Sequence, residues 1–216
     1  FPSPPRLVMC VGKCSRIVGP CLLVLGTLSV ATNVLLLFPG GDPKPLLEGH
    51  ISKHAKVIPG VWGGGIMVSS VAPTMSFLTS FCGKEDGACG SPESLSLFFP
   101  FLQLALLGAT ACFVLSGVGL TNGPLCFYNA SQHGSDLGPL WGYPFLDSSS
   151  QKPDRAENYL YNPHTWSTCL EPAGIVVWNV VLFSLLLLLS TAEMVLASLQ
   201  ILNGCLGFLC GFCEGK

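Results

Sequence analysis

Two kinds of residue in this sequence could do chemistry: one carboxylate inside a hydrophobic run, and a set of cysteines near the ends of such runs. Glu193 stands near the middle of residues 184–199, which read SLLLLLSTAEMVLASL. A carboxylate in hydrocarbon is costly, so membrane segments that keep one usually give it a hydrogen-bonding partner or a role in moving protons or ions. Glu193 is therefore the first candidate for a functional residue.

The cysteines suggest lipid attachment more than metal or redox chemistry. Cys210 and Cys213 form a C-x-x-C pair, but structural zinc takes four ligands and a thioredoxin-like site needs a supporting fold. Cysteines beside the end of a membrane helix are candidates for S-palmitoylation. Those with this placement are Cys10, Cys14, Cys82, Cys89, Cys205, Cys210 and Cys213. We interpret Cys112, which lies inside a hydrophobic run, as a packing residue.

Other arrangements that would indicate catalysis or metal binding are weak. His50 and His54 would share one face of a helix, as metal-binding pairs do, but the sequence places no third ligand beside them, so a solvated face is the preferred interpretation. We find no phosphate-binding glycine loop, no placed catalytic triad and no paired carboxylates. The sequence predicts a protein that is not an enzyme and has no cofactor or metal site.

The composition indicates the elements that must position these residues. Half of the 216 residues are hydrophobic and 10% are charged, against about 25% charged in soluble domains. Four runs are each long enough to cross a hydrocarbon core of about 30 Å at about 1.5 Å per residue. They span residues 17–38, 58–81, 95–120 and 175–202. We predict an all-α membrane protein, a bundle of four transmembrane helices.

Four crossings define two sides of the membrane. Segments 1–16, 82–94 and 203–216 lie on one side; the first loop, 39–57, and the second loop, 121–174, lie on the other. Residues 1–8 precede a methionine and are given no structural role, as a possible non-native extension.

The orientation depends on the second loop, because the ten Lys and Arg residues divide equally between the two sides. That loop contains the sequon at Asn129, which is glycosylated only on the extracellular or lumenal face. It also contains Cys126 and Cys169, a number that suits one disulfide in an oxidising compartment. We therefore predict cytosolic termini, in the plasma membrane or, alternatively, the endolysosomal membrane.

Polar residues within the spans fall at two depths. Glu193 and Gln103 lie about 13 Å and about 12 Å from the cytosolic ends of their helices, at about 1.5 Å per residue. We expect Glu193 to be protonated and hydrogen-bonded to Gln103 or to a helix of a partner protein. Asn33 and Asn179 lie about 7 Å and about 6 Å from the opposite ends and could meet each other. A structural role for Glu193 is preferred over a proton relay, because the spans contain no other acidic or basic residue.

Two further features predict packing and recognition. Gly63, Gly64 and Gly65 form a small-residue strip on the second span, against which a neighbouring helix can pack. The second loop is long and rich in aromatic residues, which need either a small core or a partner surface. A bridge from Cys126 to Cys169 would supply the covalent closure that so small a domain requires.

Several short motifs resemble those of a known family. They are MCVGKCSR from 9 to 16, NVLLL from 33 to 37, WGGG from 62 to 65, GPLC from 123 to 126, WGYPF from 141 to 145, and CLEP followed by VWNVVLFS between 169 and 184. Together they resemble the transmembrane 4 L-six family of tetraspanin-like surface antigens. The resemblance implies four spans with cytosolic termini, a glycosylated second outer loop, and association with integrins, tetraspanins and receptors that influences motility and proliferation. The inner loop departs from many members, because Cys82 and Cys89 are its only cysteines.

The preferred functional prediction is a non-enzymatic membrane scaffold that binds lipids and other membrane proteins, with homo-oligomers allowed and no nucleic acid. One alternative is a regulatory subunit or component of a proton or ion transport complex centred on Glu193. The other is cell adhesion through the second loop.

Overall fold

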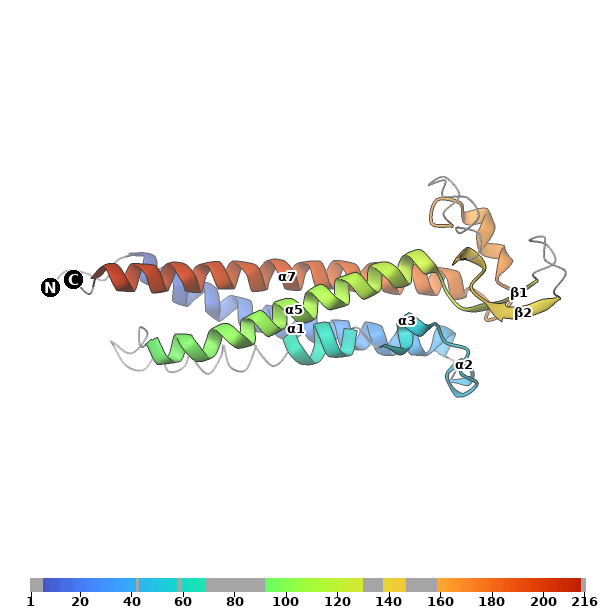
Figure 1. Cartoon of the computed structure of the whole chain (residues 1–216), viewed down its shortest axis with the longest axis horizontal. Coiled ribbons are helices and arrows are strands. Elements are labelled where there is room, and N and C mark those ends of the chain that lie inside the picture. The colour runs from blue at the N-terminus through green and yellow to red at the C-terminus, as the bar shows by residue number, and fades with distance from the viewer. Residues whose placement is uncertain are drawn as a thin grey trace. The chain divides into compact units, whose positions relative to one another are not determined.

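The computed structural model of this chain describes residues 6–41, 43–57, 60–68, 92–129, 138–146 and 159–214. Three long helices dominate it: α1 (Arg6–Leu37), α5 (Pro92–Asn122) and α7 (Ile175–Glu214) (Figure 1). The boundaries of these helices follow from the residues beside them. α1 stops before Pro39, which has no N–H to donate, and Gly40, whose φ is 67°.

The shorter elements lie in the connections. They are η1 (Pro39–Gly41), α2 (Lys44–Leu47), α3 (Lys53–Lys56), η2 (Gly60–Met67), β1 (Cys126–Asn129), β2 (Pro139–Gly142) and η6 (Pro163–Thr168). α3 begins where the Ser52 side chain accepts a hydrogen bond from the backbone N–H of Ala55, the usual N-cap arrangement. η2 is a π-helix of eight residues.

Among the described residues, three helices are long and apolar enough to cross a membrane. These candidate spans are Ile17–Leu37, Leu102–Asn122 and Ile175–Leu202. Of the second predicted span, 58–81, the structure describes only residues 60–68, so most of that prediction lies outside the described residues. α1 begins at Arg6, inside segment 1–8, for which no structural role was predicted, and α7 continues to Glu214, beyond the predicted span end. A helix does not have to end where its apolar run leaves the hydrocarbon.

The chain forms two compact units, and each long helix contributes to both. Unit 1 contains the described parts of Phe1–Val30, Gly60–Cys112 and Leu189–Lys216, and unit 2 contains those of Ala31–Pro59 and Phe113–Leu188.

The core of unit 1 is built from small and branched apolar residues. Leu102, Ala105 and Ala109 of α5 are fully buried, as is Leu22 of α1, and Ala197 of α7 is 1% exposed. The spacing of three and four residues places the α5 members on one helix face. Alanine at two of these positions lets neighbouring backbones approach closely.

Unit 2 contains a two-stranded antiparallel sheet in which Phe127 of β1 lies opposite Trp141 of β2. Two backbone hydrogen bonds attach a third segment to β1: Phe127 N–H donates to the Glu171 carbonyl and Leu170 N–H donates to the Phe127 carbonyl, each at 2.9 Å. The polypeptide just before α7 is therefore joined to the sheet.

Candidate functional site

Glu193 lies in the interior of unit 1 and is fully buried. The Ser29 hydroxyl of α1 donates a hydrogen bond to its Oε1 atom at 2.9 Å, and Ser29 is itself fully buried. The Oε2 atom has no hydrogen-bond partner among the described residues. The carboxyl group therefore joins α7 to α1 through one of its two oxygens.

Gly64 makes this arrangement possible. A Cβ atom at Gly64 would lie 2.8 Å from the Ser29 Cβ and Oγ atoms and 3.0 Å from the Glu193 Oε2 atom, closer than side chains pack. The adjacent turn is equally tight, because a Cβ atom at Gly108 of α5 would lie 2.6 Å from the Gly63 carbonyl oxygen. Gly65 is buried against Val30. All three glycines of the strip lie at close helix contacts in unit 1.

The structure does not pair Glu193 with Gln103, whereas the alternative, a hydrogen bond to a helix of a partner protein, stays a prediction. Gln103 is exposed, and the carboxyl group of Glu193 accepts its hydrogen bond from the Ser29 hydroxyl instead. Successive residues of an α-helix point about 100° apart. Because Leu102 faces the core, Gln103 is turned away from it. Equal depth along two helices does not place two side chains on facing surfaces.

The predicted contact between Asn33 and Asn179 in unit 2 does not include a hydrogen bond. Asn33 is fully buried, and neither its Nδ2 nor its Oδ1 atom has a hydrogen-bond partner among the described residues. Asn179 is 4% exposed, and its Nδ2 atom likewise has none. Buried polar groups are costly when unpaired, so these two amides are a second candidate site.

The second loop contains the predicted disulfide. Cys126 and Cys169 are bonded across a sequence separation of 43, with their Cα atoms 5.5 Å apart. Cys126 is fully buried in a cluster with Tyr159, Ile175 and Val176. The aromatic residues of the loop therefore supply a small core, which was one of the two arrangements that the sequence predicted.

Tyr159 is the centre of that core. Its hydroxyl donates to the Leu120 carbonyl, its ring stacks on Phe145 at 4.4 Å, and its own carbonyl accepts a hydrogen bond from the Trp166 indole at 2.8 Å. Burial raises the pKa of the Tyr159 hydroxyl above its ordinary value. Gly123, with φ at 75°, allows Phe145 to approach, because a Cβ atom there would lie 2.8 Å from that ring.

The first loop contacts the second through its two histidines and the segment between them. His50 stacks on Trp141 with ring centroids 3.9 Å apart and planes inclined by 5°. The Lys53 N–H donates to the Tyr143 hydroxyl at 2.9 Å. His54 Nε2 lies 2.9 Å from the Asn122 amide nitrogen. Partial burial and the nearby charge of Lys53 lower the pKa of His54.

The remaining predicted residues are the glycosylation sequon and the candidate acylation cysteines. Asn129 ends β1 and is half-buried, while the other two residues of its sequon lie outside the described residues. Cys82 and Cys89 also lie outside them. The backbone alone is described for four cysteines, which are Cys10 and Cys14 in α1 and Cys210 and Cys213 in α7. Cys205 is half-buried on α7.

Three residues of these sites were missed in the sequence. Ser29 was overlooked because a hydroxyl is a weaker polar signal than an amide. Gly108 had a usable signal, because it falls among Ala105, Ala109 and Cys112 in a small-residue pattern at helical spacing. The central position of Tyr159 had no signal that distinguishes it from the other aromatic residues of its loop.

Comparison with known proteins gives matches along nearly the whole chain. A family model described as L6 membrane protein matches residues 9–214. Transmembrane 4 L6 family member 19 of Mus musculus is 39% identical over 212 residues, covering 97% of each chain. The Homo sapiens protein of the same name is 40% identical over 204 residues, covering 93% of each. Transmembrane 4 L6 family member 1 of Homo sapiens is 35% identical over 212 residues, 95% of this chain and 96% of that protein. No solved structure matches this chain.

Proposed function

Because this chain belongs to the L6 membrane protein family, as its sequence motifs predicted, we propose that it is a non-enzymatic multi-pass scaffold that organises other membrane proteins. In this proposal four helices cross the plasma membrane, both termini are cytosolic, and the two loops are extracellular. The partners are integrins, receptors or tetraspanin-like proteins, and their organisation affects cell motility or proliferation.

The observation that carries the proposal is the second loop. It has its own disulfide and aromatic core, yet Tyr161 is 77% exposed and Leu170 is 57% exposed. A rigid support that presents exposed aromatic and aliphatic side chains is suited to binding another protein, because little conformational entropy is lost when it binds. The same surface would serve adhesion between cells, which is the second alternative.

The environment of Glu193 supports a scaffold more than a transporter. Ser29 and Gly64 enclose the carboxyl group in a close helix contact, which suits a residue that fixes the register of α7 against α1. The transport alternative has one specific observation in its favour, namely the buried Oε2 atom without a partner among the described residues.

Lipid anchors and a glycan complete the proposal. Acylation of Cys10, Cys14, Cys82, Cys89, Cys205, Cys210 or Cys213 would fix the cytosolic ends of the helices at the membrane surface. An N-linked glycan at Asn129 would mark the second loop as extracellular.

The test is quantitative mass spectrometry of the proteins that co-purify with the full chain in a mild detergent. One variant replaces the seven candidate cysteines with serine, and another combines Tyr161→Ala with Leu170→Ala. The control is Cys112→Ala, which changes a buried thiol. Membrane proteins that co-purify with the control and are lost from either variant would support the scaffold. If no membrane protein co-purifies with the unmodified chain, the scaffold is rejected, and ion flux in liposomes with Glu193→Gln as the comparison becomes the decisive assay.

A further inference from the structure

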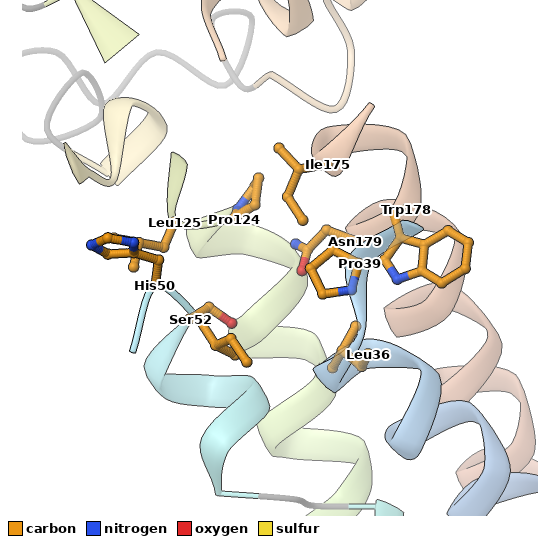
Figure 2. A pocket seen from close by; sticks show the side chains of 10 residues that line it. Leu36, Pro39, His50, Ser52, Pro124, Leu125, Ile175, Trp178 and Asn179 are labelled. Carbon is orange, nitrogen blue, oxygen red and sulfur yellow. The ribbon is translucent and has the colours of Figure 1, made fainter. Parts of the chain in front are cut away.

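A small pocket in unit 2 lies at the level where two candidate spans end. Its walls come from Leu36 near the end of α1, Ile175 and Asn179 in the first turns of α7, and Pro124 and Leu125 before β1. Figure 2 shows the Asn179 amide pointing between Pro39 and Pro124, with the Trp178 indole beside it. Asn179 lies about 6 Å along α7 from its first residue, close to the boundary between hydrocarbon and head groups.

The lining of the pocket is mostly apolar, and the Asn179 amide nitrogen is a buried donor in it without a partner among the described residues. Of its three polar residues, Ser52 accepts a hydrogen bond from Ala55, and His50 Nδ1 lies 3.3 Å from a Glu48 carboxylate oxygen. The Asn179 Nδ2 atom is buried and has no partner among the described residues. An unpaired buried amide donor is costly, so a ligand oxygen that accepts its hydrogen bond would be bound selectively.

The size and charge of the pocket restrict what can enter it. The space open to the centre of a water-sized group is about 20 Å³, and one such group needs roughly 10–15 Å³. Among the residues that the structure describes, no Lys or Arg lines it, so an anionic phosphate would be desolvated without compensation. What fits is a single neutral oxygen at the end of an apolar body.

We propose that this pocket binds the neutral oxygen of a membrane lipid, either a sterol hydroxyl or a glycerolipid ester carbonyl, as the acceptor for the Asn179 amide. The Trp178 indole N–H donates to the Leu35 carbonyl at 3.1 Å, which fixes the ring beside the pocket and ties α7 to α1. Aromatic rings with one polar edge are favoured at this depth of a membrane. The lipid therefore binds where the two helices and both loops meet within unit 2.

The test uses the full chain, purified and reconstituted into phosphatidylcholine vesicles that contain one of two photoactivatable probes, a cholesterol analogue or a phosphatidylcholine analogue. Labelling is located by peptide mass spectrometry within residues 36–57 and 123–129. Asn179→Leu replaces the hydrogen-bond donor with an apolar side chain of similar size. Leu125→Phe narrows the pocket but keeps the Asn179 amide. Gln103→Leu is the matched control, because it makes a similar change at an exposed position. Loss of one neutral hydrogen bond should lower labelling by about threefold to tenfold.

Labelling that falls in Asn179→Leu and remains in Gln103→Leu supports the proposal, and the probe that gives it identifies the lipid. If Asn179→Leu fails to elute as the unmodified chain does in gel filtration, Leu125→Phe decides by the same criterion. Equal labelling of all variants, or no labelling of these peptides by either probe, overturns the proposal. The occupant of the pocket would then be water and not a lipid. Protein partners are absent from the vesicles, so the result is independent of the proposed scaffold function.

Discussion

Replacing Gly64 with alanine is the most direct test of the close contact that holds Glu193. The added Cβ atom would lie 2.8 Å from the Ser29 Cβ atom and 3.0 Å from the Glu193 Oε2 atom, so α1 or α7 must shift. Overpacking of this kind costs about 1–3 kcal/mol. Alanine recovers up to about 1 kcal/mol, because it favours helix over glycine. With about 1 kcal/mol recovered, the net loss of unfolding free energy should be about 0–2 kcal/mol.

The measurement is the unfolding midpoint, Tm, of the purified chain in a mild detergent, followed by intrinsic tryptophan fluorescence. A loss of 1 kcal/mol lowers Tm by about 2–4 °C in a chain of this size, so we expect Gly64→Ala to lower it by up to about 8 °C. Gly117→Ala is the matched control, because the nearest atom to its new Cβ, Leu187 Cδ2, would be 3.9 Å away. Its Tm should be unchanged or slightly higher.

A second substitution tests the cause. Ser29→Gly removes the Cβ and Oγ atoms that the new methyl group would meet, so the double variant with Gly64→Ala should lose less stability than the sum of the two single variants. If Gly64→Ala and Gly117→Ala have the same Tm, the close approach of these helices is incorrect. Strict additivity in the double variant would likewise refute the contact with Ser29.

Three further predictions concern the loops and the carboxyl group. Cys169→Ser opens a loop closed across a separation of 43 residues and should destabilise the fold by about 4 kcal/mol, seen as trypsin cleavage of the second loop at lower temperature. Because the pKa of His54 lies below its ordinary value of 6.5, its neutral form is favoured in the fold, and the stability that this form confers should be lost as pH falls below 6.5. The protection factors for hydrogen exchange in residues 138–146, which correct for the slower intrinsic exchange at lower pH, should then fall between about pH 7.5 and about pH 5.5, less so in His54→Gln, whereas the exposed His164→Gln should behave as the unmodified chain. Glu193→Gln should keep surface expression and the amount of co-purified membrane protein within about twofold, because the amide oxygen can still accept a hydrogen bond. If assembly is intact but ion flux in liposomes is abolished, the proton-relay alternative is favoured.

Much of the fold could be predicted because hydrophobic runs and special residues leave strong local signals. The spans ending near Leu37 and beginning at Ile175 follow from continuous apolar sequence beside Pro39 and Gly174. The Cys126 to Cys169 bridge followed from the number and location of the cysteines. The partner of Glu193 could not be found in this way, because depth along a helix is a single coordinate. A hydrogen bond also requires that two side chains face each other, and that depends on helix rotation.

Helix rotation in unit 1 is governed by volume more than by polarity. An interhelical hydrogen bond in a membrane protein contributes on the order of 0.6 kcal/mol, less than the cost of about 1–3 kcal/mol for forcing one extra methyl group into a packed contact. The glycine at position 64 therefore decides how closely α1 and α7 approach, and the Ser29 to Glu193 hydrogen bond forms where that approach brings the two groups to 2.9 Å. It follows that small residues at helical spacing are the better guide to which polar residues meet. The small-residue pattern around Gly108 orients α5 with Ala105 and Ala109 toward the core, and this orientation places Gln103 on the exposed face.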